Sequence, residues 1–316
     1  MSQTEQPTAP TETQASLPTR NTLPAKSQLP GLFADPNLIQ YWDTYYLYPT
    51  SDGFEDWAGT SFSVLSSPDL VDWTDHGTIL TLGTDVTWAS ERAWAPAAAQ
   101  RNGKFYFYFT ANGNIGVAVA HSPTGPFKDL GKPLVPAGVF AGFTIDPSVF
   151  VDKDGSAYLY WGNGTAHGVK LNEDMVSFDP GAVVSWNPEG FREAAWVHRR
   201  GESYYLSWSE NDTREDDYRV RYASGPGPLG PWTHHGVILE KDLERGIRAT
   251  GHHSILNVEG TEDWIIAYHR FAIPGGNGFN RETLFERLVH RPDGSIATVE
   301  FGDEPLRIPI APQSSR

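Results

Sequence analysis

Short runs of alternating apolar and polar side chains recur along the chain from residue 31 onward, and clusters of Gly, Asp and Asn separate them. In FTIDPSVFVDKDGSAYLYWG (residues 143–162), the run containing Val149 and Val151 and the run AYLYW flank the turn sequence Asp-Lys-Asp-Gly. A period of two is typical of β-strands, and long stretches of helical periodicity are almost absent. The pattern predicts an all-β protein.

A strand, a polar turn and a second strand occur together five times. The copies begin at Ala34, Trp94, Ile145, Arg192 and Gly251. Successive copies lie about fifty to sixty residues apart, which leaves room for two further strands in each. Five four-stranded units of this kind predict a five-bladed β-propeller. A β-sandwich also contains many short strands, but it would not explain the period.

Residues 1–30 differ in composition from the rest of the chain. They are rich in Pro, Thr, Gln and Ser and contain almost no large apolar side chain, so burial cannot offset the entropy of ordering them. We expect residues 1–30 to be a disordered N-terminal tail or linker and residues 31–316 to form the propeller domain. The segment lacks the basic and apolar stretches of a secretory signal. The localisation is therefore open between the cytoplasm and export of a chain whose signal is not in this sequence.

The composition excludes several classes of partner. Asp and Glu outnumber Lys and Arg by 39 to 24, which gives a net charge of -15, and no basic run is present. We expect neither nucleic acid nor an anionic membrane as a partner, and no feature indicates a protein partner. No apolar stretch is long enough to predict a membrane span. Without cysteine, the chain has neither disulfides nor thiolate chemistry.

The residues that open the inner strands of a propeller converge at one end of its axis. In the five copies these positions are Asp35, Ala95, Asp146, Glu193 and His252. Buried carboxyl groups repel each other and resist desolvation, so three of them cost stability unless they bind a ligand or do chemistry. Two carboxyls on opposite sides of a pocket are the minimum for glycoside hydrolysis, and a third can tune their pKa values.

The three carboxyls have different neighbours and therefore different expected roles. Glu193 has the longer side chain and precedes an apolar Ala-Ala-Trp segment, which would raise its pKa as a general acid requires. Asp35 lies in a more polar Asp-Pro-Asn segment and is the better candidate for an ionised base. The neighbours of Asp146 do not by themselves assign it either role. The alternative is that each Asp-Pro pair only caps a turn and that the glutamate is solvated.

The converging strand ends would form a funnel at one end of the axis. Aromatic side chains around this funnel would pack on the C–H faces of a sugar. The candidates are Trp57, Trp94, Phe143 and Trp161, although aromatic residues of this kind also fill blade cores. Arg281 lies on the final strand, where a guanidinium could bridge a carboxylate and a sugar hydroxyl. Its nearby competitors for this role are Arg270, Arg287 and Arg291.

His252 is a candidate metal ligand. The HExxH and paired-cysteine spacings of zinc sites are absent, and no Asp-rich calcium loop is present. One imidazole together with waters could still hold a hydrated calcium on the axis, and the alternative is a histidine hydrogen-bonded to water. The hydrolytic chemistry itself requires no cofactor.

At these residues the sequence resembles glycoside hydrolase family 43, over roughly residues 31–301. The matching segments are ADP at 34–36, WAP at 94–96, IDPSVFVDKDG from 145, REAAWVHRRGESYYLSWS from 192, GHHS at 251–254 and RET at 281–283. The resemblance implies that Asp35 is the general base, Asp146 the pKa modulator and Glu193 the general acid. It also implies that Trp94 and Arg281 are in the binding site and that His252 is the axial histidine. The acid segment departs from the family pattern in reading EAAW, where many members have a proline two residues after the glutamate.

The resemblance implies a five-bladed propeller and an inverting mechanism. It also implies that the substrate is a plant cell-wall oligosaccharide or polysaccharide. The loops over the funnel are moderate in length, which favours a pocket for a terminal sugar. We expect exo-action on α-L-arabinofuranosyl residues of arabinan or arabinoxylan, with β-D-xylosidase or bifunctional activity as the alternative and endo-arabinanase activity as a second one. A non-catalytic carbohydrate-binding propeller would not need the three carboxyls together, and a protein-interaction platform would predict apolar or arginine-rich loops instead.

Overall fold

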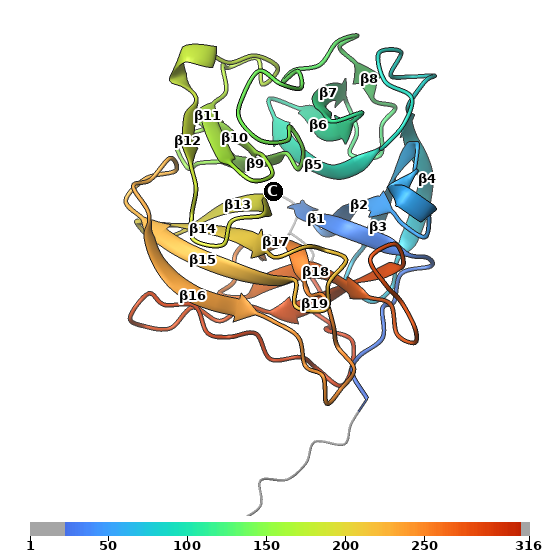
Figure 1. Cartoon of the computed structure of the whole chain (residues 1–316), viewed down its shortest axis with the longest axis vertical. Helices are drawn as coiled ribbons and strands as arrows, with labels where there is room; N and C mark the ends of the chain where they lie inside the picture. Colours follow the sequence, from blue (N-terminus) through green and yellow to red (C-terminus); the bar gives the residue numbers. More distant parts are fainter. Residues whose placement is uncertain (1–22, 311–316) are drawn as a thin grey trace, which may run out of the picture.

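Five antiparallel sheets surround a central axis in the computed structural model, which describes residues 23–310 (Figure 1). The prediction of an all-β, five-bladed propeller is confirmed. One strand of each sheet lies next to the axis. These inner strands are β1 (Phe33–Tyr41), β5 (Trp94–Arg101), β9 (Ser148–Val151), β13 (Glu193–Arg200) and β17 (Gly251–Asn257).

The remaining strands follow outward in each blade. The second strands are β2 (Thr44–Ser51), β6 (Lys104–Ala111), β10 (Ala157–Trp161), β14 (Ser203–Glu210) and β18 (Trp264–Phe271). The third strands are β3 (Ser61–Ser67), β7 (Asn114–Ala120), β11 (Ala166–Lys170), β15 (Arg219–Gly225) and β19 (Arg281–Arg287). The outer strands are β4 (Thr74–Thr81), β8 (Lys128–Asp129), β12 (Val184–Trp186) and β16 (Thr233–Leu239). Two short 3-10 helices, η1 (Glu55–Trp57) and η2 (Pro180–Ala182), lie in loops, and no helix between residues 23 and 310 could span a membrane.

The fifth blade differs from the predicted four-stranded unit. Within the described residues its sheet contains three strands, β17, β18 and β19. After β19 the chain makes an isolated bridge between His290 and Ile296 and then joins the neighbouring blade, where the Val299 N–H donates to the Ile238 carbonyl of β16 at 2.7 Å. The segment that could have formed a fourth strand is thus paired with blade four.

The two ends of the described chain lie against the junction of the fifth and first blades. Ala25 is buried, donates its N–H to the Gly302 carbonyl and accepts from the Arg270 guanidinium at 2.6 Å. Ile308 and Ile310 donate to carbonyls of the turn before β4. We expected residues 23–30 to belong to the tail, but this segment contacts the propeller. Residues 1–22 of the expected tail and residues 311–316 lie outside the described residues.

Aromatic side chains fill the spaces between blades. Between the first and second blades, Phe62 packs edge-on against Phe107 with ring centroids 5.2 Å apart, and Phe109 adjoins both. All three are fully buried. Burying such a side chain stabilises a protein by roughly 1.5–3 kcal/mol, so these contacts make the blades a rigid frame around the axis.

Each inner strand is preceded or opened by a residue in the left-handed conformation. These residues are Asp35 (φ 48), Ala95 (φ 43), Asp146 (φ 60), Ala194 (φ 58) and His252 (φ 40). In four blades the pairing with the second strand is also shifted at this point, as in a β-bulge, which re-aims side chains. The prediction that Glu193 is the counterpart of Asp35 in the fourth blade was wrong by one residue, because Ala194 and not Glu193 is left-handed. Glu193 instead occupies the repeat position of Gly251.

Neighbouring blades hold these strained positions in place. Four of the left-handed residues donate their backbone N–H to a side chain from the second strand of the preceding blade. The pairs are Asp35 with His269 (3.2 Å), Ala95 with Thr50 (2.7 Å), Asp146 with Thr110 (3.0 Å) and His252 with Ser209 (2.9 Å). The backbone around the axis therefore depends on the closed ring of blades.

Candidate active site

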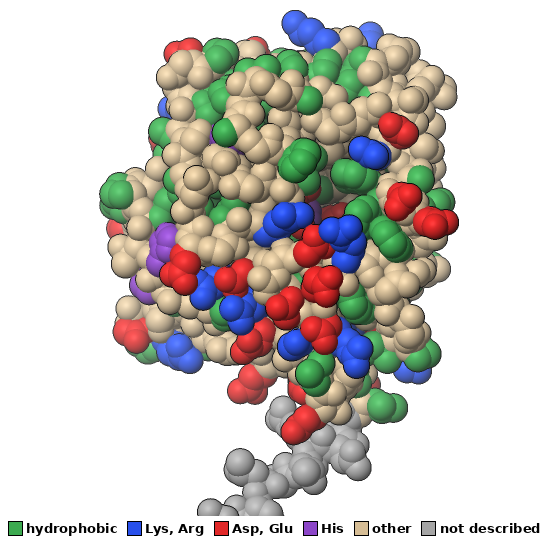
Figure 2. Space-filling model, viewed as in Figure 1, with side chains coloured by type: hydrophobic (Ala, Val, Ile, Leu, Met, Phe, Trp, Pro, Cys, Tyr) green, Lys and Arg blue, Asp and Glu red, His purple; other side chains and the backbone are tan. Residues whose placement is uncertain are grey.

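A pocket of about 200 Å³ opens near the centre of one face of the propeller (Figure 2). Drug-sized ligands occupy pockets of roughly 300–1,000 Å³, so this one suits a smaller group. Acidic and basic side chains gather around and below the opening in this view. The lining residues are Asp35, Trp57, Trp94, Ile145, Asp146, Asn163, Arg192, Glu193, Asp212, Thr213, Arg214, His252 and Arg281.

Asp35 is surrounded by positively charged and imidazole groups. Its Oδ1 atom lies 3.1 Å from Arg281 Nη1, 3.1 Å from His269 Nδ1 and 3.3 Å from His252 Nδ1. Burial alone would raise the pKa of Asp35, but the charge of Arg281, together with the neighbouring imidazoles of His252 and His269, holds it well below its usual value. Asp35 is therefore ionised at neutral pH and able to accept a proton.

Glu193 has neutral hydrogen-bond donors on both carboxyl oxygens. Tyr218 donates to Oε1 at 2.8 Å, Asn163 donates to Oε2 at 2.6 Å, and Arg192 Nε is 4.0 Å from Oε2. Burial raises the pKa of Glu193, and the bond from Tyr218 and the charge of Arg192 offset only part of that rise. A raised pKa favours the protonated form that can donate a proton.

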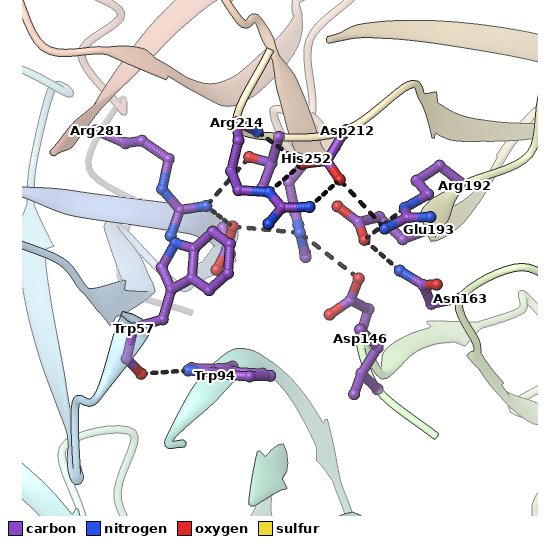
Figure 3. Close-up of a pocket in the computed structure, with 13 residues that line it drawn as sticks. Trp57, Trp94, Asp146, Asn163, Arg192, Glu193, Asp212, Arg214, His252 and Arg281 are labelled. Carbon is purple, nitrogen blue, oxygen red and sulfur yellow. Dashed lines mark hydrogen bonds and ion pairs between the residues drawn. The ribbon is translucent and has the colours of Figure 1, made fainter. Parts of the chain in front are cut away.

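Asp146 points towards the axial histidine, His252, from the opposite side of the pocket (Figure 3). Its Oδ2 atom is 3.9 Å from His252 Nδ1 and is buried without a hydrogen-bond partner among residues 23–310. Burial raises the pKa of Asp146 well above its usual value, and the charges of Glu193 and Asp35 raise it further. Since this repulsion is mutual, Asp146 also acts on the titration of Glu193.

Two of the four predicted aromatic residues line the pocket. Trp57 and Trp94 lie across it from Glu193 and Asn163 (Figure 3), with their rings nearly perpendicular and 6.3 Å apart. The prediction for Trp161 was wrong, because its side chain is fully buried in the core between the second and third blades. Phe143 is 72% exposed and is not among the lining residues, although its backbone pairs with Asn163.

An ion-pair network lies at the mouth of the pocket. Asp212 accepts from Arg214 at 2.7 and 2.8 Å and from Arg192 at 3.4 Å. The bonds with Arg214 lower the pKa of Asp212 to about 2. The Arg214 guanidinium also lies 5.9 Å from the Trp57 ring. The network ties the loop before β15 to the wall that carries Glu193.

Sequence reasoning missed several residues that hold the candidate groups. They are Asp52, Asn163, Arg192, Asp212, Thr213, Arg214, Tyr218 and His269. Most of them stand on second strands or loops rather than at the repeat position that drew attention to Asp35. The three competitors of Arg281 have other partners. Arg270 pairs with Glu282 and Arg287 with Asp263. Arg291 donates to the Ser295 hydroxyl and the Ile296 carbonyl.

The donor set near His252 could hold a cation but does not suit calcium well. One atom each of Asp146, Glu193 and His252 lie within 4.8 Å of one another, and Asp146 Oδ2 has no hydrogen-bond partner in the part of the chain that the structure describes. Calcium takes six to eight oxygen ligands, whereas this cluster offers two carboxylates and a nitrogen. A cation here would also occupy two of the three candidate carboxyls.

The pocket thus combines an ionised carboxylate, a carboxyl biased towards its protonated form and an aromatic wall. This combination can accept a proton from water at one side of a bound sugar and donate a proton at the other.

Comparisons with known proteins agree with this chemistry. The model of "Glycosyl hydrolases family 43" matches residues 26–296. A "Beta-D-galactofuranosidase xynD" of Aspergillus niger is 33% identical, over 90% of this chain and 87% of its own length. "Xylosidase/arabinosidase 43A" of Humicola insolens is 32% identical, over 84% of this chain and 96% of its own length.

Solved structures give the same relationship. The crystal structure of a family 43 arabinoxylan arabinofuranohydrolase from Bacillus subtilis, in complex with cellotetraose, superposes with a TM-score of 0.78. It is 30% identical in sequence, and the match covers 89% of this chain and 69% of that one.

Proposed function

The chain belongs to glycosyl hydrolase family 43, and we propose that it is an inverting, exo-acting α-L-arabinofuranosidase. Its substrates would be terminal arabinofuranosyl residues of arabinan or arabinoxylan, polysaccharides of the plant cell wall. The observation that carries the proposal is the contrast between Asp35 and Glu193, because one small pocket holds the first ionised and biases the second towards protonation.

The proposed reaction is a single displacement. Asp35 accepts a proton from a water molecule while the oxygen of that water attacks the anomeric carbon. At the same time Glu193 donates its proton to the departing glycosidic oxygen. Arg281 stabilises ionised Asp35 in this scheme. Asp146 and Glu193 repel each other when both are ionised, so the pair retains one proton to higher pH, and in this scheme Asp146 thereby helps to keep Glu193 protonated. The attack occurs opposite the leaving group, so the product anomer is inverted.

The size and lining of the pocket support a terminal pentose as the bound sugar. A volume of about 200 Å³ leaves little room for several sugar rings, and Trp57 and Trp94 offer aromatic surface. The named activities of the relatives include two furanosidases and a xylosidase/arabinosidase. The alternative is therefore β-D-xylosidase or bifunctional activity, since arabinofuranose and xylopyranose present similarly placed hydroxyls.

The test compares hydrolysis of p-nitrophenyl α-L-arabinofuranoside and β-D-xyloside by the wild-type chain and its Asp35→Ala and Glu193→Ala variants. We expect the arabinofuranoside to be preferred and Asp35→Ala to lose roughly 10²–10⁴-fold in kcat on both. Glu193→Ala should lose a similar factor on arabinoxylan but much less on the aryl glycosides, whose leaving group needs no proton. Azide should restore turnover to Asp35→Ala.

The matched control is Glu202→Ala, at an exposed hairpin turn of the same sheet as Glu193, which should behave as wild type. Proton NMR of the first-formed sugar should show the inverted anomer. Equal losses by Glu193→Ala on all substrates would remove Glu193 from the acid role. No hydrolysis of either glycoside by folded protein would favour an endo-arabinanase or a sugar-binding propeller.

A further inference from the structure

We propose that Tyr218 and His269 act as one stacked pair that sets the positions of Glu193 and Asp35 relative to each other, and that Gly251 provides the space for it. Both would be positioning residues and not catalytic ones. The inference rests on the proposed function for the roles of Glu193 and Asp35.

Each ring of the pair contacts one of the two carboxyls. Tyr218 donates its hydroxyl to Glu193 Oε1 at 2.8 Å. His269 places Nδ1 3.1 Å from Asp35 Oδ1 and 3.2 Å from the Asp35 amide nitrogen. In one tautomer Nδ1 donates to the carboxylate, and in the other it accepts from the amide. His269 therefore holds Asp35 in either tautomer, with Thr213 at 3.2 Å on its other nitrogen.

The two rings are parallel and in contact. Their planes differ by 8° and their centroids are 5.6 Å apart, as in an offset stack. Both side chains are fully buried. A packed interior transmits displacement, so a movement of one ring is passed to the other and to the carboxyl that it holds.

Gly251 leaves the space in which the Tyr218 ring of this stack lies. It is the direct cross-strand partner of His269 in the β17–β18 ladder, and the Tyr218 ring occupies the space that its side chain would need. A Cβ atom at Gly251 would lie inside the van der Waals contact distance of Tyr218 Cε1 and Cδ1. Aromatic rings that cover a glycine in this way are a known means of fixing strand geometry. The same repeat position carries Glu193 in the fourth blade.

The pair predicts that Tyr218 influences Asp35, which it does not touch. Tyr218→Phe keeps the ring and loses only the bond to Glu193, so the pKa of Glu193 alone should rise. Tyr218→Leu also removes the ring on which His269 stacks, so the pKa of Asp35 should rise as well. Gly251→Ala displaces the ring and should shift both carboxyls. His269→Phe keeps the stack and should shift Asp35 alone.

The experiment titrates the carboxyl groups of the full chain by NMR, with aspartate and glutamate labelled with ¹³C at the side-chain carboxyl, and measures pH profiles of kcat/KM in parallel. We expect Tyr218→Leu and Gly251→Ala each to move the Asp35 pKa by about half a unit or more, with Tyr218→Phe leaving it in place. The titration needs no turnover, so it decides the proposal even if the chain hydrolyses neither glycoside.

The matched control is Tyr205→Leu, because Tyr205 also stacks on a buried histidine, His198, with centroids 5.0 Å apart, outside the pocket lining. It should reduce the melting temperature without moving either pKa. The proposal is overturned if Tyr218→Leu, or Gly251→Ala where only that variant folds, leaves the Asp35 pKa at the value found in Tyr218→Phe. A shift of similar size in Tyr205→Leu would also overturn it, because the effect would then be one of general destabilisation.

Discussion

Asp52 accepts hydrogen bonds from Arg281 with both carboxylate oxygens and positions the guanidinium beside the axis. Oδ1 accepts from Nη2 at 2.9 Å, and Oδ2 accepts from Nε at 3.1 Å and from the backbone N–H of the same arginine at 2.7 Å. Both side chains are nearly inaccessible to solvent, and the remaining nitrogen, Nη1, points to Asp35. A fork of this kind fixes the guanidinium plane, so Asp52 decides where the charge that faces Asp35 lies.

Arg281→Lys tests this relationship. Lysine keeps one positive charge but cannot serve Asp52 and Asp35 together, because it lacks the planar fork. Since Arg281 lowers the pKa of Asp35, we expect that pKa to rise and the acid limb of the kcat/KM profile to move upward by about one unit. The control is Arg287→Lys, at a more exposed pair with Asp263, which should leave the limb in place. An unmoved acid limb in Arg281→Lys would show that Arg281 does not set the ionisation of the base.

Asp146→Asn should act on the opposite side of the pH profile. The carboxyls of Asp146 and Glu193 repel each other when ionised, so removing one charge lowers the pKa of the other. We expect the alkaline limb of kcat/KM to move to lower pH. Asp154→Asn, at an exposed turn, is the control. An unchanged profile in the Asp146 variant would leave Asp146 with a structural role only.

Glu286 should make the stability of the fold depend on pH. It is buried, accepts from the Gly302 N–H at 3.1 Å, and burial raises its pKa to about 7 from an ordinary 4.5. A raised folded-state pKa means that stability is full below about pH 4.5 and is lost as the pH rises through 7. Glu286→Gln should therefore be more stable than wild type at pH 8, by up to about 3 kcal/mol, and equal to it near pH 4.

Urea unfolding at the two pH values measures this difference. Glu282→Gln is the contrasting variant, because Glu282 pairs with the buried Arg270 at 2.8 Å. It should destabilise the fold at both pH values, by about 3–5 kcal/mol if the arginine is left uncompensated. A stability gain for Glu286→Gln that is the same at pH 4 and pH 8 would contradict the assignment.

Chelation should leave hydrolysis within about twofold of the untreated enzyme, because the proton transfers proposed for Asp35 and Glu193 use no metal-bound group, and the donor set near His252 would leave most calcium ligands to water. The measurement is kcat/KM after treatment with EDTA and dialysis, and again after addition of calcium. Loss of activity on chelation that calcium restores would establish a metal at the axis. His252→Gln should then abolish the calcium response.

Much of the fold was predictable because its determinants are local. Alternation within each strand and turn residues between strands are read from neighbouring positions, and their repetition predicts the blades. The positions of Asp35, Asp146 and His252 followed from the same repeat. The assignment failed by one residue at Ala194, because the bulge that sets the local register is not encoded in the spacing.

The partners of the candidate groups were decided by the closed ring. Arg281 reaches Asp35 across 246 positions and Asp52 across 229, and His269 reaches Asp35 across 234. No local pattern marks such pairs. The same holds for the aromatic residues, since Trp57 and Trp94 line the pocket while Trp161 fills the core between blades. Through its local periodicity, the sequence by itself determined the number of blades and the positions of the carboxyl residues at the starts of the inner strands. Only the tertiary structure decided which charges and rings surround each carboxyl, because those contacts exist once the fifth blade meets the first.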